Sequence, residues 1–260
     1  MRIVVVDNVM QVGESVARAL DGTGHSVAWA LTPELLGGML GGGQRFDLAF
    51  VDMDFGRMSE QSGLTVLRHL GAVSVPSVLY SADSEDSRLL FLLAAFQFHR
   101  PLGLLSKEAP GDDVRALVEA VAAGEQPAAR FRGDRYRPPA RDRGAPWLDR
   151  LIPSTTDLGI WEQLPHYSSR WELARTAHVS ERTVDNFLIR HADTVRELER
   201  SFLHRPDPQP VAVPDAALGR RARTTLLAPL HAFAVMHFRF FRDPELRPLV
   251  EGRRRTAGRL

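Results

Sequence analysis

The stretch Asp47-Leu48-Ala49-Phe50-Val51-Asp52-Met53-Asp54 decides the fold of the first half of this chain. Its four consecutive apolar residues, Leu48 to Val51, are typical of a strand buried on both faces of a parallel sheet. The run ends in Asp52, and ligands of open α/β sheets bind just beyond the carboxyl ends of the strands. The stretch therefore predicts a central strand that delivers a carboxylate to a site. A lone aspartate at this place also suits a helix cap or a solvated turn.

The same pattern occurs on both sides of this stretch. Five short apolar runs are each followed by a segment in which apolar residues have helical spacing. This alternation predicts a doubly wound α/β unit with a five-stranded parallel sheet. The predicted strands are Ile3–Val6, His25–Ala30, Leu48–Val51, Val75–Tyr80 and Leu102–Leu105, and the predicted helices are Val12–Leu20, Pro33–Leu40, Leu64–Leu70, Asp86–Phe96 and Asp112–Ala122.

Polar side chains stand at the ends of four predicted strands. They are Asp7, Asp52, Ser81 and Lys107, and Lys107 is the only lysine of the chain. Because the carboxyl ends of parallel strands lie side by side, these side chains are expected to meet at one edge of the sheet. Two carboxylates can bind Mg2+, a hydroxyl can donate to a phosphoryl oxygen, and an ammonium can pair with the phosphoryl charge.

In this combination the residues resemble the receiver domain of bacterial response regulators. The segments that carry the resemblance are Val4–Asp7, Asp47–Asp52, Val78–Ala82 and Gly103–Ala109, and the resemblance covers about residues 1–123. It implies a flavodoxin-like α/β receiver with a five-stranded parallel sheet. A receiver domain also implies a sensor histidine kinase as a partner.

The resemblance further implies a role for each pocket residue. Asp52 would be the phosphoacceptor, and Asp7 and Asp52 would hold Mg2+. Ser81 would be the switch hydroxyl, and Lys107 would pair with the phosphate. The complete expected pocket is Asp7, Asn8, Asp52, Asp54, Ser81 and Lys107.

Two positions depart from the family pattern. Asn8 stands where the family usually has a second acid, and an amide oxygen lacks the charge that strengthens a Mg2+ site. Leu104 stands at the switch position of the fifth strand, where the family has Tyr or Phe. Both departures favour a second interpretation, in which an atypical receiver is not phosphorylated conventionally and serves dimerisation or small-molecule sensing.

A third interpretation is enzymatic. The segment Asp52-Met53-Asp54 resembles the DxD nucleophile motif of haloacid-dehalogenase-type phosphatases. That motif normally follows the first strand of its domain, whereas here it follows the third, and the match is only three residues long. We therefore expect no enzyme activity.

The two halves of the chain differ in charge. The chain has 260 residues, of which 44% are hydrophobic and 25% charged, so one or two globular domains are expected. Residues 1–125 hold 9 basic and 16 acidic residues, a balance of −7, whereas residues 126–260 hold 24 and 16, a balance of +8. An acidic half joined to a basic half predicts a nucleic-acid contact in the second half.

Residues 124–147 form a candidate linker between the halves. They contain four prolines and six arginines with few apolar residues, which predicts a flexible or extended connector. A basic arm that adds phosphate contacts to DNA binding is the alternative. The expected division is a receiver over 1–123, this Arg/Pro-rich linker, and a helical DNA-binding domain over 148–260.

The second half contains a predicted helix pair joined by a tight turn. Trp171–Ala177 is followed by a helix that begins at Glu181 and runs to about Leu203, with Ser180 as its expected N-cap. A short helix, a tight turn and a second helix predict a helix-turn-helix at about residues 169–192. The segments Glu172–Arg175 and Val179–Asn186 resemble the LuxR/NarL-type DNA-binding domain. An ordinary amphipathic helix pair is the alternative.

The second resemblance implies a set of DNA contacts. Arg182 and Asn186 would read base edges, arginine at guanine and asparagine at adenine. Asp185 departs from the family, which often has lysine there, because an acid that faces DNA repels phosphate. Four further residues are expected to contact phosphates, namely Arg170, Arg175, Thr183 and Arg190. The complete expected set is Arg170, Arg175, Ser180, Arg182, Thr183, Asn186 and Arg190.

The last part of the chain, residues 206–260, carries no motif that we recognise. Helices are predicted over Asp215–Leu227 and, after Pro229, over Leu230–Phe241. The many aromatic residues of the second helix are expected to be buried, either against the helix-turn-helix, which we favour, or in a dimer interface. Residues Arg253–Arg255 are expected to form a frayed basic tail.

The sequence also bears on location and partners. The absence of cysteine excludes disulfides and thiolate metal sites, and no apolar run approaches the roughly 20 residues that span a bilayer. An acid at position 7 is atypical of a signal peptide. We expect a cytoplasmic transcriptional regulator without a membrane contact, active as a homodimer and bound to double-stranded DNA.

Overall fold

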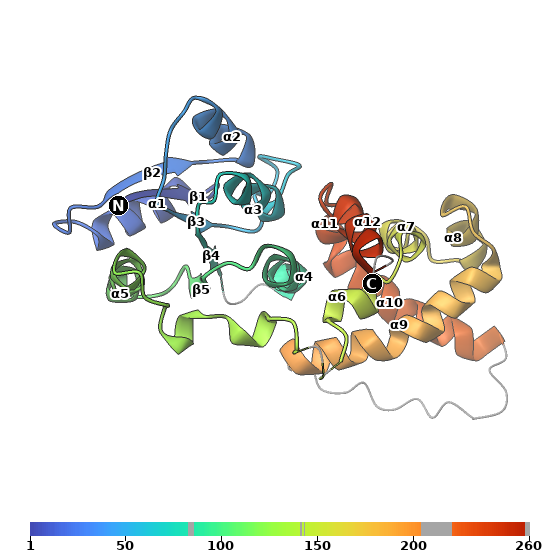
Figure 1. The fold of residues 1–260 in the computed structure, drawn as a ribbon. Helices are drawn as coiled ribbons and strands as arrows, with labels where there is room; N and C mark the ends of the chain where they lie inside the picture. The colour runs from blue at the N-terminus through green and yellow to red at the C-terminus, as the bar shows by residue number, and fades with distance from the viewer. Residues whose placement is uncertain (83–85, 141, 143, 204–219, 258–260) are drawn as a thin grey trace. The chain divides into compact units, whose positions relative to one another are not determined.

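A computed structural model describes the chain except for residues 83–85, 141, 143, 204–219 and 258–260. The chain divides into two compact units, Met1–Pro138 and Pro139–Leu260 (Figure 1). The first unit thus extends beyond residue 123, where the sequence places the end of the first domain. Among the described helices, none combines the length and the apolar character that crossing a membrane requires.

The first unit is built on a five-stranded parallel sheet with the order β2-β1-β3-β4-β5. This order is the flavodoxin-like, doubly wound topology, so the predicted fold of this half is confirmed. The central strand β3 pairs with β1 on one side and β4 on the other, and all four of its residues are buried. The strands are β1 (Arg2–Val6), β2 (Ser26–Ala30), β3 (Leu48–Val51), β4 (Ser77–Ser81) and β5 (Gly103–Ser106).

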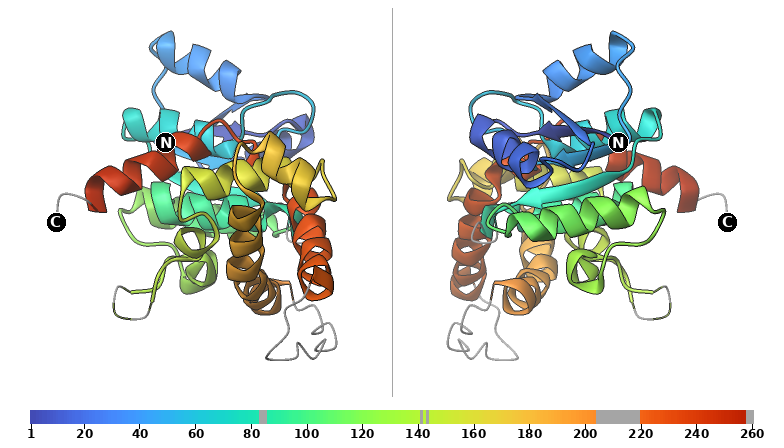
Figure 2. Two further views of the ribbon diagram at one scale, coloured as in Figure 1. Left: turned by 90° about the vertical axis from the view of Figure 1, so that its right-hand side faces the viewer. Right: turned by 90° about the vertical axis from the view of Figure 1, so that its left-hand side faces the viewer.

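Helices cover both faces of this sheet. Helices α1 and α5 contact each other over one face, and α2, α3 and α4 lie over the other (Figures 1 and 2). The helices are α1 (Met10–Ala19), α2 (Pro33–Gly41), α3 (Gly63–Ala72), α4 (Leu89–Ala94) and α5 (Gly111–Ala122).

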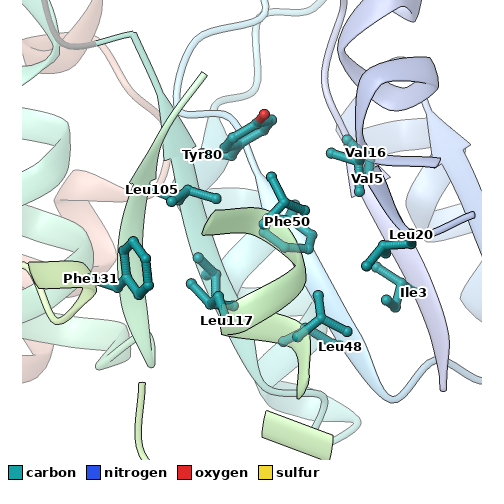
Figure 3. Close-up of a cluster of buried hydrophobic side chains, with 13 residues drawn as sticks. Ile3, Val5, Val16, Leu20, Leu48, Phe50, Tyr80, Leu105, Leu117 and Phe131 are labelled. Carbon is teal, nitrogen blue, oxygen red and sulfur yellow. The ribbon is translucent and has the colours of Figure 1, made fainter. Parts of the chain in front are cut away.

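A hydrophobic cluster lies between the sheet and the α1–α5 face (Figure 3). Alternate residues of the strands point into it, because side chains of a strand alternate between faces. Phe50 and Tyr80 contact each other edge to face, with ring centroids 5.5 Å apart. The other buried members are Ile3, Val5, Val16, Leu20, Leu48, Val78, Leu105, Val114, Leu117, Val118 and Phe131.

The predicted helix Asp86–Phe96 differs in the structure. It consists of a 3-10 turn η1 (Asp86–Arg88), the α-helix α4, and a π-helical segment η2 (Ala95–His99) that ends at Arg100 with a left-handed φ of 52°. π-Helical turns are rare and commonly lie near functional sites. Phe96, inside η2, is buried at 1% exposure.

Part of the expected connector packs on the first unit. Residues 129–137, here called the docking segment, contain the 3-10 turns η3 (Ala129–Phe131) and η4 (Asp134–Tyr136). The Phe131 side chain is 5% exposed and belongs to the hydrophobic cluster. Its carbonyl oxygen lies so close to Gly103 of β5 that a Cβ there would collide with it. The prediction of a flexible connector is therefore wrong over these residues.

Phe96 receives the other end of the docking segment. The Tyr136 ring stacks on it at a centroid distance of 6.1 Å and an angle of 13°. The Arg137 guanidinium lies 5.1 Å from the centre of the same ring. Gly133, with φ of 62°, approaches the ring so closely that no other residue fits there. Aromatic anchors therefore outweigh the high charge and proline content that suggested a flexible linker.

The second unit is helical throughout its described elements, which agrees with the expected all-α class. Its helices are α6 (Trp147–Leu151), α7 (Thr155–Gln163), α8 (Arg170–Thr176), α9 (Glu181–Phe202), α10 (Arg220–Met236), α11 (Phe238–Phe241) and α12 (Leu246–Ala257). Residues 204–219, where the sequence predicts a proline-rich segment and the start of a helix, lie outside the described residues.

Trp161 of α7 is the centre of the second core. Its ring is fully buried, stacks on Phe241 at 4.7 Å and contacts Phe187 of α9 edge to face at 4.9 Å. Phe233 of α10 lies 5.7 Å from the same ring. The Trp161 indole N–H donates to the Leu151 carbonyl oxygen at 2.9 Å. The C-terminal aromatics are thus buried against the helix pair of the same chain, and the favoured intramolecular option is confirmed.

Two predictions for the C-terminal region need correction. Pro229 does not separate two helices but lies inside α10, on its exposed side, while Leu230 and Phe233 of the same helix are buried in the core. Burial of this apolar face outweighs the backbone hydrogen bond that proline removes. Arg253 does not belong to a frayed tail, because it lies in α12, pairs with Asp149 and donates to the Ile152 carbonyl oxygen at 2.9 Å.

The docking segment gives a test of the fold. We expect Phe131→Ala to destabilise the chain by about 3–5 kcal/mol, because it removes a buried aromatic ring from the hydrophobic cluster. Urea unfolding of the full chain measures this loss. Gln126→Ala, an exposed position just before the segment, is the matched control and should stay within about 0.5 kcal/mol. Equal stability of both variants and the wild type would show that the segment does not pack on the first unit and would support a flexible connector.

Candidate functional site

Backbone hydrogen bonds fix three of the predicted pocket residues at the carboxyl edge of the sheet. The Asp7 N–H donates to the Ala30 carbonyl oxygen at 3.1 Å, and the Asp52 N–H donates to Val6 at 2.9 Å. The Lys107 N–H donates to the Ser81 carbonyl oxygen at 3.0 Å. The strand pairing therefore continues one residue past each strand and holds these residues beside one another.

The three side chains meet. The Lys107 ammonium lies 2.7 Å from Asp7 Oδ2 and 2.8 Å from Asp52 Oδ2. Asp7 and Asp52 are only 2% and 1% exposed, so both ion pairs are buried. At this depth an ion pair is screened little by solvent. The pocket is therefore a tightly paired cluster rather than an open acidic surface.

A fourth side chain, which the sequence did not single out, completes the cluster. The Arg88 guanidinium, from the 3-10 turn η1, forms a buried ion pair with Asp52 Oδ1. The same oxygen accepts the Met53 N–H at 2.7 Å. Arg88 is itself 8% exposed. Both oxygens of the Asp52 carboxylate are thus engaged, one by Arg88 and the other by Lys107.

The remaining expected pocket residues lie around this cluster. Ser81 ends β4, is 2% exposed, and its hydroxyl contacts the Ala82 carbonyl oxygen at 3.5 Å. The Asp54 carboxylate accepts the Gly56 N–H at 2.9 Å and so stabilises the local turn. The Asn8 amide nitrogen lies 3.5 Å from the position that a Cβ on Gly56 would take. Asp54 and Asn8 thus both border the Gly56 turn.

The charges of the cluster act on Asp52 in opposite directions. Burial raises the pKa of the Asp52 carboxyl above its ordinary value, and the nearby Asp7 charge also raises it. The charges of Arg88 and Lys107 lower the pKa of Asp52 but do not fully offset burial. The two acids and two bases bring the formal charge of the cluster to zero.

This balance fits a Mg2+ ion poorly. A strong magnesium site needs carboxylate charge and oxygens that are open to the ion. Here the side chains of Asp7 and Asp52 already contact cations, and Asn8 adds no charge. Within the described ranges, no group of three or more His, Cys, Asp or Glu side chains is placed to hold a metal ion. The expected Mg2+ at Asp7 and Asp52 stays a prediction from the resemblance.

The second unit contains the helix pair that the sequence predicts. Ser169 caps α8 by accepting the Glu172 N–H at 3.2 Å, and Ser180 caps α9 by accepting the Thr183 N–H at 3.1 Å. Between them His178 takes a left-handed φ of 54°, and the Val179 N–H donates to the Ala174 carbonyl oxygen at 2.9 Å. These bonds close the turn tightly.

Asp185, the acid that departs from the family pattern, has a partner within the pair. Its carboxylate lies 2.7 Å from Arg170 Nη1, with both side chains largely buried. The ion pair joins the first turn of α8 to α9. Asp185 therefore stabilises the helix pair, and Arg170 is engaged by this acid rather than being an unpaired cation at the surface.

The other residues of the expected DNA set differ in exposure and partners. Arg182 and Asn186 are exposed on the first turns of α9. Arg175 is exposed and lies 4.9 Å from the ring centre of Trp171, which is itself 57% exposed. Arg190 pairs with Asp157 at 2.9 Å. The set therefore shares one helix pair, and the exposed Trp171 is an addition that the sequence did not single out.

A buried polar cluster attaches α9 to α7. The Asp157 carboxylate, 5% exposed, lies 3.1 Å from His191 Nε2 and also contacts the Ser154 hydroxyl. Burial raises the pKa of Asp157, but the hydrogen bonds of His191 and Ser154 and the charges of His191 and Arg190 outweigh burial and lower that pKa. The ionised carboxylate thus stabilises the position of α9.

This cluster predicts a pH-dependent stability. A lowered folded-state pKa contributes stability that is present above the unfolded value near pH 4 and is lost as pH falls through the folded value. We expect Asp157→Asn to cost about 1–3 kcal/mol at pH 7, with the difference from the wild type shrinking below about pH 4. Urea unfolding at a series of pH values measures it.

The exposed pair of Asp193 and Arg196 on α9 supplies the control. Asp193→Asn removes an acid of the same helix whose partner is exposed, so little change is expected at any pH. A cost of Asp157→Asn that stays the same from pH 7 to pH 3 would show that the ionised carboxylate does not stabilise this unit.

Comparisons with known proteins give fold likenesses only. Neither the family models nor the curated proteins contain a match. Among solved structures, the response regulator ChrA of a heme-sensing two-component system is 19% identical, with 88% of this chain and 96% of that chain covered and a TM-score of 0.42. The receiver domain of NtrX from Brucella abortus is 20% identical, with 46% and 98% covered and a TM-score of 0.39.

A third solved structure has a similarly low identity and TM-score. The N-terminal domain of a response regulator/sensory box/GGDEF three-domain protein from Carboxydothermus hydrogenoformans is 21% identical, with 47% of this chain and 94% of that chain covered and a TM-score of 0.40. Identities and TM-scores this low carry no information about activity. The function therefore has to be argued from the residues of this chain.

Proposed function

We propose that the chain is a DNA-binding transcriptional regulator of the response-regulator type, in which a receiver-like unit controls a helix-turn-helix unit. The observation that carries this proposal is the capped helix pair α8–α9, whose second helix exposes Arg182 and Asn186 on its first turns. An exposed helix start after a tight turn is the part of a helix-turn-helix that enters the major groove.

The exposed residues have suitable chemistry. Arg182 can donate two hydrogen bonds to guanine, and Asn186 can pair with adenine. They lie four residues apart, so they share one face of α9. Arg175 adds positive charge for phosphate contacts, whereas Arg190 already pairs with Asp157. The balance of +8 over residues 126–260 supports a salt-dependent attraction to DNA.

The pocket around Asp52 is the proposed input. In one version, a sensor histidine kinase transfers a phosphoryl group to Asp52, and altered packing around Ser81 and Lys107 changes dimerisation or exposure of the DNA-binding unit. In the other, the receiver works without phosphorylation and serves dimerisation or ligand sensing. The ion pair between Arg88 and Asp52 favours the second version, because it engages an oxygen that an incoming phosphoryl group needs.

Selection from a random DNA pool followed by anisotropy titration tests DNA binding. We expect the full chain to enrich a defined duplex sequence. Arg182→Ala should weaken binding to that sequence by about 1–3 kcal/mol, because a bidentate base contact is lost.

Arg196→Ala is the matched control. It removes the same charge from the same helix, about 21 Å along its axis, where Arg196 pairs with Asp193. Its affinity for the selected sequence should remain close to that of the wild type. Failure to enrich any sequence, or an equal loss in both variants, would contradict base reading by α9.

A further inference from the structure

We propose that Arg88 is a built-in cation that takes the place of a divalent metal at Asp52 and so closes the pocket to Mg2+ and to phosphoryl donors. The inference rests on the pocket that the proposed function uses as its input. It does not depend on DNA binding, and loss of DNA binding would leave it unchanged.

The first step is the geometry of the Asp52 carboxylate. One oxygen contacts Arg88 and accepts the Met53 N–H, and the other contacts Lys107. A metal ion that binds this carboxylate has to displace one of the two cations. Because the cluster is buried, displacement breaks a charge-assisted ion pair and leaves the removed cation to be accommodated elsewhere. Binding of Mg2+ is therefore opposed by the folded structure itself.

The second step is the charge balance, which also accounts for Asn8. The negative charges of Asp7 and Asp52 are matched by the positive charges of Lys107 and Arg88. An aspartate at position 8 would leave an unmatched negative charge beside the cluster. The amide of Asn8 avoids this, so Asn8 and Arg88 suit each other. Because Asp7 and Asp52 already contact cations, this cluster attracts a divalent cation weakly.

The third step is the position of Arg88 in the fold. It lies in the 3-10 turn η1, immediately before α4, and its side chain is buried rather than extended into solvent. Its guanidinium presents donors in a fixed fork that suits a carboxylate. Arg88 is therefore a buried part of the cluster. Its ion pair connects Asp52, at the end of β3, to the start of α4.

Mg2+ titration of the full chain by calorimetry tests the proposal. The wild type should show no saturable binding at millimolar Mg2+. Arg88→Ala and Arg88→Gln should bind Mg2+ at least about tenfold more tightly than the wild type, because each frees an Asp52 oxygen and leaves the pocket with a net negative charge. Arg88→Lys, which keeps the charge, should resemble the wild type.

A second readout uses acetyl phosphate with Mg2+ and intact-mass analysis. Transfer forms a bond between an Asp52 oxygen and phosphorus and releases acetate. We expect the mass gain of one phosphoryl group in Arg88→Ala and Arg88→Gln, its loss when Asp52→Asn is added, and no gain in the wild type. Arg45→Ala is the matched control, since it removes an exposed arginine before the opposite end of β3 and should behave as the wild type.

The proposal is overturned in either of two ways. Saturable Mg2+ binding or a phosphoryl adduct in the wild type, at the level of the Arg88 variants, would show that Arg88 does not close the pocket. Equal inertness of the wild type and of correctly folded Arg88→Ala and Arg88→Gln, judged by circular dichroism, would show the same. The wild-type titration decides the first case even if a variant does not fold.

Discussion

The ion pairs of the buried Asp52 carboxylate are the constraint on which the first unit depends. Burial of a carboxylate is costly unless cations and hydrogen-bond donors surround it. Here Lys107 joins Asp52 to Asp7 across neighbouring strands, and Arg88 joins it to the turn before α4. The same contacts join the residues of the sheet edge and, by our proposal, close it to Mg2+. In the proposed function, the stability of the unit and its input therefore depend on the same carboxylate.

The sequence predicted the sheet and most of this cluster for a simple reason. Parallel strands end at the same edge, so residues at the strand ends, Asp7, Asp52 and Lys107, have to meet once the five apolar runs are recognised. Arg88 follows no strand. Its position depends on the 3-10 turn before α4, and a turn of this kind has no clear signal in the periodicity of the sequence. The side chain that completes the site was therefore missed.

The docking segment shows that amino-acid composition alone does not predict whether a segment is flexible. Arginine and proline content predicted a flexible connector, but Phe131 enters the core and Tyr136 stacks on Phe96. Phe96 closes the predicted helix Asp86–Phe96, and Tyr136 lies in the segment expected to be a connector. Their contact was not predictable, because it joins a helix end to a segment about 40 residues later. In the second unit, Trp161 likewise assembles aromatics from distant helices into one core.

The most direct test of this account is a double-mutant cycle between Asp52 and Arg88. Urea unfolding of the wild type, Asp52→Ala, Arg88→Ala and the double variant gives the coupling energy of the two side chains. The account predicts a favourable coupling of about 0.5–3 kcal/mol, because the pair is buried and the Arg88 guanidinium contacts Asp52 Oδ1 directly. Additive effects of the two substitutions would contradict it, since the guanidinium would then not be the counter-ion of Asp52.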